Sequence, residues 1–117
     1  MSGIMSSMSA VLLLVVLGTT AALDLLRHPR ALETTSRLGI PAGAVPFLGL
    51  VKAAAAVGII LGFAHLRLAE LTGACLVVYF AIATLTHIRA KDRIANAIPA
   101  FLLMLVSLAY LAAKVAA

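Results

Sequence analysis

Four long apolar runs, separated by short charged or Pro/Gly-bearing segments, constrain the fold of this chain more than any other feature. They cover about residues 5–26, 44–64, 68–88 and 94–115. Each run approaches the ~20 residues that an α-helix needs to cross ~30 Å of hydrocarbon at ~1.5 Å per residue. The sequence therefore predicts an all-α integral membrane protein, a four-helix bundle with four transmembrane helices and short loops, in which residues 1–117 form one transmembrane domain.

The composition argues against a soluble fold. The chain is 64% hydrophobic and only 11% charged, whereas soluble domains carry roughly 25% charged residues. A soluble chain of this length would bury only about two-thirds of its surface. The net charge of +5 would suggest nucleic acid in a soluble protein, but here the basic residues gather at the helix ends. We therefore expect the lipid bilayer as solvent and no nucleic-acid partner.

The chain offers few groups for chemistry of its own. Cys75 is its single cysteine, which excludes an internal disulfide and a two-cysteine redox relay. No span carries a two-histidine haem or metal arrangement, and no nucleotide-binding motif is present. We accordingly predict no catalytic residues and no metal site, and we expect that the chain is not an enzyme by itself.

The basic residues also predict an orientation. With four spans, the loops at about 27–43 and 89–93 share one side, while the loop at 65–67 and both termini share the other. Six basic residues lie on the first side, and two lie on the second. They are Arg27, Arg30, Arg37, Arg89, Lys91 and Arg93, against Arg67 and Lys114. The positive-inside rule then places loops one and three in the cytoplasm and both termini outside.

The first loop is the only extramembrane segment of any size. Pro29 ends the first helix, and Pro41 precedes the second. We expect an ordinary basic loop between them. The alternative is a short amphipathic turn at the interface, with Leu32 and Leu38 facing the membrane and Arg37 facing anionic headgroups.

Lys52 lies well inside the second apolar run. It is about eight residues, hence ~12 Å, from the start of its helix. A lysine at that depth costs on the order of 2.5 to 3.5 kcal/mol, so a partner or a wet cavity is expected. Because about three residues separate the second and third helices, we expect a tight antiparallel hairpin that places Lys52 level with Tyr79.

Several polar residues fall near Lys52 under this arrangement. The predicted cluster is Asp24, Lys52, Tyr79, Thr84 and His87. One interpretation is a polar pocket that binds a headgroup, a quinone or a proton. The simpler interpretation is a lysine that snorkels to the interface and an interfacial histidine, which together only fix the helix register.

Two further features are interpreted as structural. Gly58 and Gly62 have the spacing that lets helix backbones approach closely, and packing within the chain is favoured over a homo-oligomer contact, although a homo-oligomer stays possible. Glu70 opens the third helix, where an acidic side chain suits the helix dipole and can pair with Arg67.

The polar landmarks resemble those of the DoxX-like family of small four-helix bacterial membrane proteins, over about residues 38–105. They are Lys52 after a Leu-Gly run, Glu70, the Thr86-His87 pair and Asp92. Family members often have an acidic residue where this chain has Tyr79, and often a glycine where it has Lys91. The resemblance implies a multi-pass protein of the bacterial inner membrane, and it puts a charge partner for Lys52 on helix three in doubt, with Asp24 as the substitute.

The residues and the resemblance together leave three functions open. The first reading is a non-catalytic accessory or assembly subunit that packs against other membrane proteins or membrane-associated proteins. The alternative is a quinone-binding component of a thiosulfate:quinone oxidoreductase-like redox system, with quinone as the possible cofactor. A second alternative is a small transporter, although the first span carries no charge before Asp24.

Overall fold

The computed structural model describes residues 2–116 and is helical throughout its long elements. Four of its helices are long and apolar enough to cross a membrane, so the predicted all-α bundle of four membrane-spanning helices is confirmed. The elements are α1 (Ser2–Leu25), α2 (Pro29–Arg37), the 3-10 turn η1 (Ala42–Ala44), α3 (Val45–Gly62), α4 (Leu66–Arg89) and α5 (Ile94–Val115).

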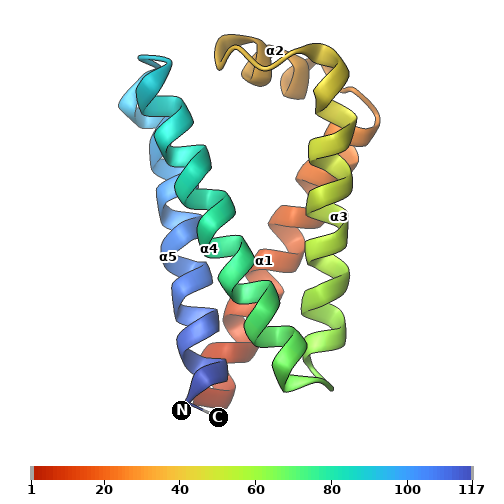
Figure 1. The fold of residues 1–117 in the computed structure, drawn as a ribbon, viewed down its shortest axis with the longest axis vertical. Helices are drawn as coiled ribbons and strands as arrows, with labels where there is room; N and C mark the ends of the chain where they lie inside the picture. The colour runs from red at the N-terminus through yellow and green to blue at the C-terminus, as the bar shows by residue number, and fades with distance from the viewer. Residues whose placement is uncertain (1, 117) are drawn as a thin grey trace.

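The four long helices form two pairs. α4 packs mainly on α5, and α1 packs mainly on α3, with smaller contacts between α1 and α5 and between α3 and α4. Both termini lie at one end of the bundle, where the pairs meet, and the pairs diverge towards the other end, which α2 crosses (Figure 1). We call this the α2 end. The expected tight hairpin of α3 and α4 therefore holds near its turn and not along its whole length.

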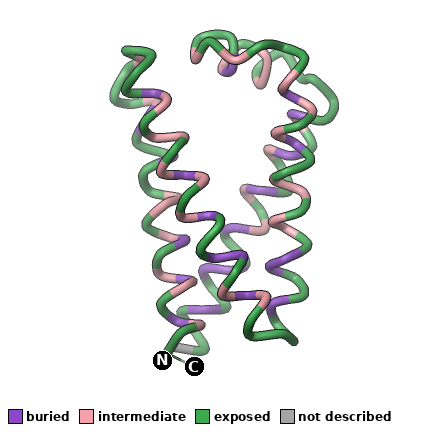
Figure 2. Tube along the Cα trace, viewed as in Figure 1, coloured by how far each residue is buried: buried purple, intermediate pink, exposed green. Residues whose placement is uncertain are grey.

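The core lies where the helices cross. Its buried apolar members come from all four long helices, and Figure 2 shows buried positions on the inward side of each. Large apolar side chains cover the outer surface instead. In a membrane that surface faces lipid, whose chains are as apolar as the side chains themselves. Core members are Ala10, Leu13, Leu17, Ile59, Ala69, Leu76, Phe80 and Tyr110.

Two glycines of α3 permit its close approach to α4. A Cβ added at Gly58 would collide with the side chain of Thr72. At Gly62 an added Cβ would lie 2.9 Å from Cβ of Ala69 and 2.9 Å from the hydroxyl oxygen of Tyr110. Both glycines thus lie at contacts between helices of the same chain.

The segment expected to be an ordinary loop forms the nine-residue helix α2 instead. Pro29 occupies its first turn, where a missing N–H costs nothing, and Nδ1 of His28 accepts a hydrogen bond from the backbone N–H of Arg30 at 3.2 Å. Left-handed residues flank the helix: Arg27 has a φ of 53° and Gly39 a φ of 78°. These two reversals turn the chain across the end of the bundle.

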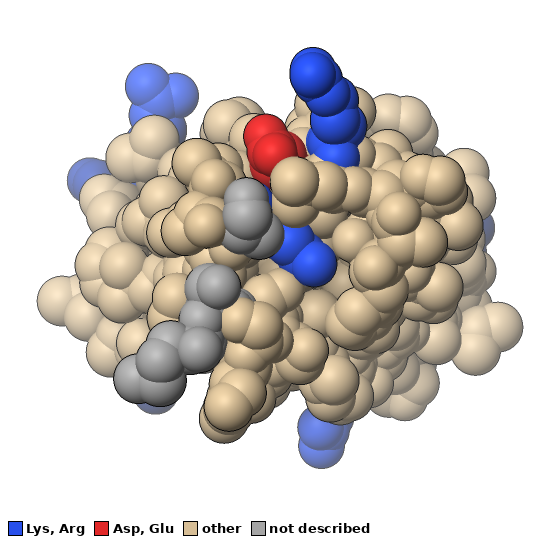
Figure 3. Space-filling model, turned by 90° about the horizontal axis from the view of Figure 1, so that it is seen from below, with Lys and Arg blue, Asp and Glu red and all other residues tan. Residues whose placement is uncertain are grey.

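The end that carries the termini is sparsely charged. Seen from that end, the surface is mostly uncharged, with a few basic side chains scattered over it and an acidic side chain among them (Figure 3). Glu70 lies half-buried in α4, which begins at Leu66 and has no acidic residue in its first turn, so the expectation that Glu70 opens this helix is wrong. Among residues 2–116 no ion pair joins Glu70 to Arg67, so the suggested pairing is wrong.

Candidate functional site

A cavity of about 530 Å³ lies between the diverging helix pairs, on the side of α2. All five helices contribute to its wall, which is mainly apolar, with a few polar groups among alanine, leucine and isoleucine side chains. Ligand sites in proteins are mostly apolar clefts of roughly 300 to 1,000 Å³ with a small number of placed polar groups. The cavity therefore has the size and lining of a small-molecule site.

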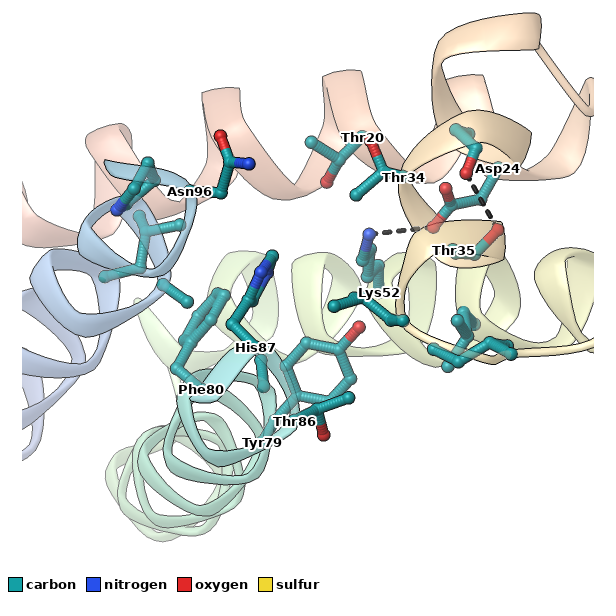
Figure 4. A pocket seen from close by; sticks show the side chains of 18 of the residues that line it. Thr20, Asp24, Thr34, Thr35, Lys52, Tyr79, Phe80, Thr86, His87 and Asn96 are labelled. Carbon is teal, nitrogen blue, oxygen red and sulfur yellow. Dashed lines mark hydrogen bonds and ion pairs between the residues drawn. The ribbon is translucent and has the colours of Figure 1, made fainter. Parts of the chain in front are cut away.

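An ion pair lies in this cavity. Nζ of Lys52 on α3 is 2.7 Å from Oδ2 of Asp24 on α1 (Figure 4). The Asp24 side chain is 7% exposed and that of Lys52 is 17% exposed. Lys52 thus directs its ammonium group into the bundle, where it donates to a carboxylate, instead of extending along the outer surface.

Gly49 makes this pair possible. It lies one turn before Lys52 on α3 and is buried against the end of α1. A Cβ added there would lie 2.9 Å from Cγ of Leu25 and 3.0 Å from Cβ of Asp24. Because glycine has no Cβ, α3 can approach the end of α1 closely enough for Lys52 to reach Asp24.

α4 supplies the opposite wall. Tyr79, Thr86 and His87 line the cavity, and Figure 4 shows Tyr79 and His87 pointing to the same space as Lys52. The hydroxyl of Thr84 donates to the carbonyl of Phe80 at 2.8 Å, and Thr84 is not among the lining residues in the described part of the chain. Of the five predicted cluster members, the cavity brings together Asp24, Lys52, Tyr79 and His87, and it leaves Thr84 out.

A second polar cluster closes the α2 end and centres on Asp92, in the turn between α4 and α5. Nδ1 of His87 lies 2.9 Å from its Oδ2, and the side-chain amide of Asn96 donates to its Oδ1 at 2.9 Å. Nη1 of Arg37, on α2, lies 3.5 Å from Oδ1. Arg37 therefore connects α2 to the opposite helix pair, where an orientation towards lipid headgroups had been the alternative.

The residue before Asp92 adopts an unusual backbone conformation. Lys91 has a φ of 56°, in the left-handed region that costs other residues roughly 1 to 2 kcal/mol and that glycine adopts freely. The backbone of the turn thus has a conformation that favours glycine, and a lysine adopts it here.

The Asp92 cluster predicts a pH dependence. The pKa of Asp92 is lowered from its ordinary 3.8 to about 2, chiefly by the hydrogen bond from Asn96, then by that from His87, with smaller contributions from the backbone N–H of Arg93 and the charge of Arg37. A carboxyl whose pKa is lower in the folded state stabilises the fold fully above the unfolded value. That stabilisation is lost as the pH falls from 3.8 through about 2.

The unfolding midpoint, measured in mixed detergent micelles at a series of pH values, is expected to fall across this window. Asp92→Asn is expected to remove this part of the fall and to lower the midpoint above pH 4. Glu33→Gln is the control, because Glu33 is exposed and lies in no ion pair of the described residues. An unchanged fall in Asp92→Asn would show that other carboxyl groups carry it.

Sequence reasoning missed part of this site. Thr20, Arg37 and Asn96 contribute to the cavity wall and were not among the predicted members. Thr20 lies four residues before Asp24 in α1, and residues four apart share a helix face, so this spacing was the available signal for Thr20. No such signal marks Asn96, whose partner Asp92 lies in the turn before α5, or Arg37, whose position depends on the fold of α2.

Comparison with known proteins gives one match. A family model described as the DoxX-like family matches residues 8–109. No curated protein and no solved structure matches the chain.

Proposed function

The chain belongs to the DoxX-like family, and from this premise and its cavity we propose that it is a quinone-binding accessory subunit of a membrane redox system. The main support for this proposal is the cavity of about 530 Å³ with the Asp24–Lys52 ion pair in its wall. The protein's part in this proposal is to hold the quinone ring. A partner protein passes electrons to or from it.

The charge of the cavity supports an uncharged ligand. Lys52 is paired with Asp24 and Arg37 with Asp92, and Arg30, the remaining cation of the lining, is exposed. In the buried part of the cavity an anionic headgroup would have to approach the Asp24 carboxylate, and a cation would have to approach the Lys52 ammonium group. A quinone ring is neutral, and its carbonyl oxygens accept hydrogen bonds.

Suitable donors point at such a ring. The ammonium group of Lys52 has three N–H donors, of which Asp24 uses one. The phenol hydroxyl of Tyr79 lies beside it in Figure 4. Phe80 and Leu103 add apolar wall against which the faces of a ring can pack. Lys52 and Tyr79 are accordingly assigned as carbonyl-binding residues.

The sequence supports the accessory role. Cys75 is the single cysteine, so one chain cannot cycle between a dithiol and a disulfide. Tyrosine and lysine bind a quinone ring but do not carry electron pairs to it at ordinary potentials. The chain therefore contributes the binding site, and the electron carrier belongs to another subunit.

Quinone affinity tests this function. The double variant Asp24→Asn, Lys52→Met replaces the pair by uncharged groups of similar size. It is expected to raise the Kd for a tail-less benzoquinone roughly 10-fold or more, since hydrogen bonds from charged donors contribute about 1.5 to 3 kcal/mol. The measurement is isothermal titration calorimetry on protein in lipid nanodiscs. Arg67→Gln, an exposed charge outside the cavity, is the control. An unchanged Kd in the double variant would contradict the assignment.

A further inference from the structure

We propose that the ligand carries one long apolar tail, and that this tail leaves the bundle through a second cavity between α3 and α4. This inference rests on the proposed quinone site and adds the route and the chemical class of the bound molecule. That class is a neutral amphipath with a compact hydrogen-bond-accepting head and a single chain.

The second cavity has a volume of about 240 Å³ and adjoins the first. Lys52 and Tyr79 line both cavities, so they stand at the boundary between them. The head of a ligand in the first cavity can contact these two side chains. The second cavity then lies on the other side of the same two side chains. The two spaces together form one route from the α2 end to the side of the bundle.

The second cavity opens to the outer surface of the bundle. Val51 and Ala54 on α3, and Leu71 and Cys75 on α4, line it and are exposed. Both helices are membrane spans, so this opening faces lipid. A tail lying in it therefore passes from protein to bilayer without crossing water.

The lining of the second cavity suits a hydrocarbon chain. Ala54, Ala55 and Cys75 are small and leave space between the helices. The hydroxyl of Thr72 donates to the carbonyl of Leu68 at 2.8 Å, which turns its polar atom to its own helix. Beyond the boundary residues, the wall presents apolar groups, and each methylene that it covers contributes about 0.8 kcal/mol.

The width of the opening argues for one tail. α3 and α4 stay in contact on the far side of the cavity, where Gly58 meets Thr72. A two-chain phospholipid would need both chains in the same 240 Å³ space. Isoprenoid quinones and single-chain neutral lipids share the required chemistry, and the experiment separates them.

The experiment compares a long-chain quinone with its tail-less ring in nanodiscs. Ala54→Phe fills the second cavity. It is expected to weaken binding of the long-chain quinone roughly tenfold or more and to leave the Kd of the tail-less ring unchanged. Val57→Phe is the control, since Val57 is also exposed on α3 but lines neither cavity. An equal effect of Ala54→Phe on both ligands, or none on the long-chain quinone, would overturn the inference and leave the proposed function standing.

Photo-crosslinking identifies which class of molecule places its tail in the second cavity. A long-chain quinone with a diazirine in the tail is expected to label residues 51–55 and 71–76, which mass spectrometry of the digested protein locates. Labelling elsewhere would overturn the inference. Labelling of these residues by a diazirine monoacylglycerol, with no binding of either quinone, would support the tail route and overturn the proposed function. Binding of none of these molecules would overturn both.

Discussion

Lys52→Met is expected to destabilise the folded bundle by about 3 kcal/mol, because removal of one partner leaves the other as an unpaired buried charge. The remaining carboxylate of Asp24 is 7% exposed, and Lys52 is its only ion-pair partner among residues 2–116. Asp24→Asn is expected to cost somewhat less, since the lysine stem is flexible and its ammonium group can move towards the α2 end.

The double variant tests whether the side chains of Asp24 and Lys52 stabilise the fold through their contact with each other. Asp24→Asn, Lys52→Met leaves no buried charge, and exchange of a whole buried ion pair for uncharged groups is often nearly neutral. We therefore expect it to be more stable than either single variant. Reversible unfolding in dodecyl sulfate mixed micelles measures all four proteins, and Arg67→Met, which removes an exposed cation, is the control. Strictly additive losses in the double variant would show that the two side chains do not interact in the membrane.

Gly58→Ala is expected to cost about 2 kcal/mol, as for other overpacked contacts. The new Cβ would collide with Thr72, whose β-branched side chain is held by the hydrogen bond to Leu68 and cannot turn away easily. α3 and α4 would have to separate at this contact. The same unfolding assay measures this loss.

A second substitution provides the rescue. Thr72→Ala removes the two nearest atoms and leaves only Cβ, at 3.3 Å from the added group. Gly58→Ala combined with Thr72→Ala is thus expected to recover most of the loss. Gly18→Ala is the matched control: it lies in α1 with nothing within 4 Å of the added Cβ, so stability should stay unchanged or rise by up to ~1 kcal/mol. A loss at Gly58 that Thr72→Ala fails to recover would contradict the contact.

The membrane spans could be predicted from sequence because their positions and lengths depend almost entirely on the length of each apolar run and the thickness of the bilayer. Asp24 was identified as a partner for Lys52 because both fall in the same half of adjacent spans. For α2 the sequence offered a short amphipathic turn only as the alternative to an ordinary loop, since nine mainly polar residues carry no apolar run, and only Pro29 marks the start of the helix. A short helix of that composition forms through its contacts, which a sequence does not display.

Thr84 shows a different limit of prediction from sequence. A helical wheel places it on the same face of α4 as Phe80 and His87, but it does not fix how far that helix turns about its axis. α4 packs mainly on α5, and Phe80 and His87 line the cavity together with Tyr79 and Ala83, whereas Thr84 does not. Thr84 therefore lies beyond the edge of the cavity-facing side, and the packing of α4 determines where that edge falls.

The divergence of the two helix pairs makes the bundle a lever. Gly58 and Gly62 hold α3 against α4 towards the end that carries the termini, and the first cavity lies towards the other end. A small change of crossing angle at these two glycines is magnified along α3, whose 18 residues span about 27 Å. The width of the first cavity therefore depends on contacts whose residues do not line it, and lateral pressure from the bilayer acts on the long arm of that lever.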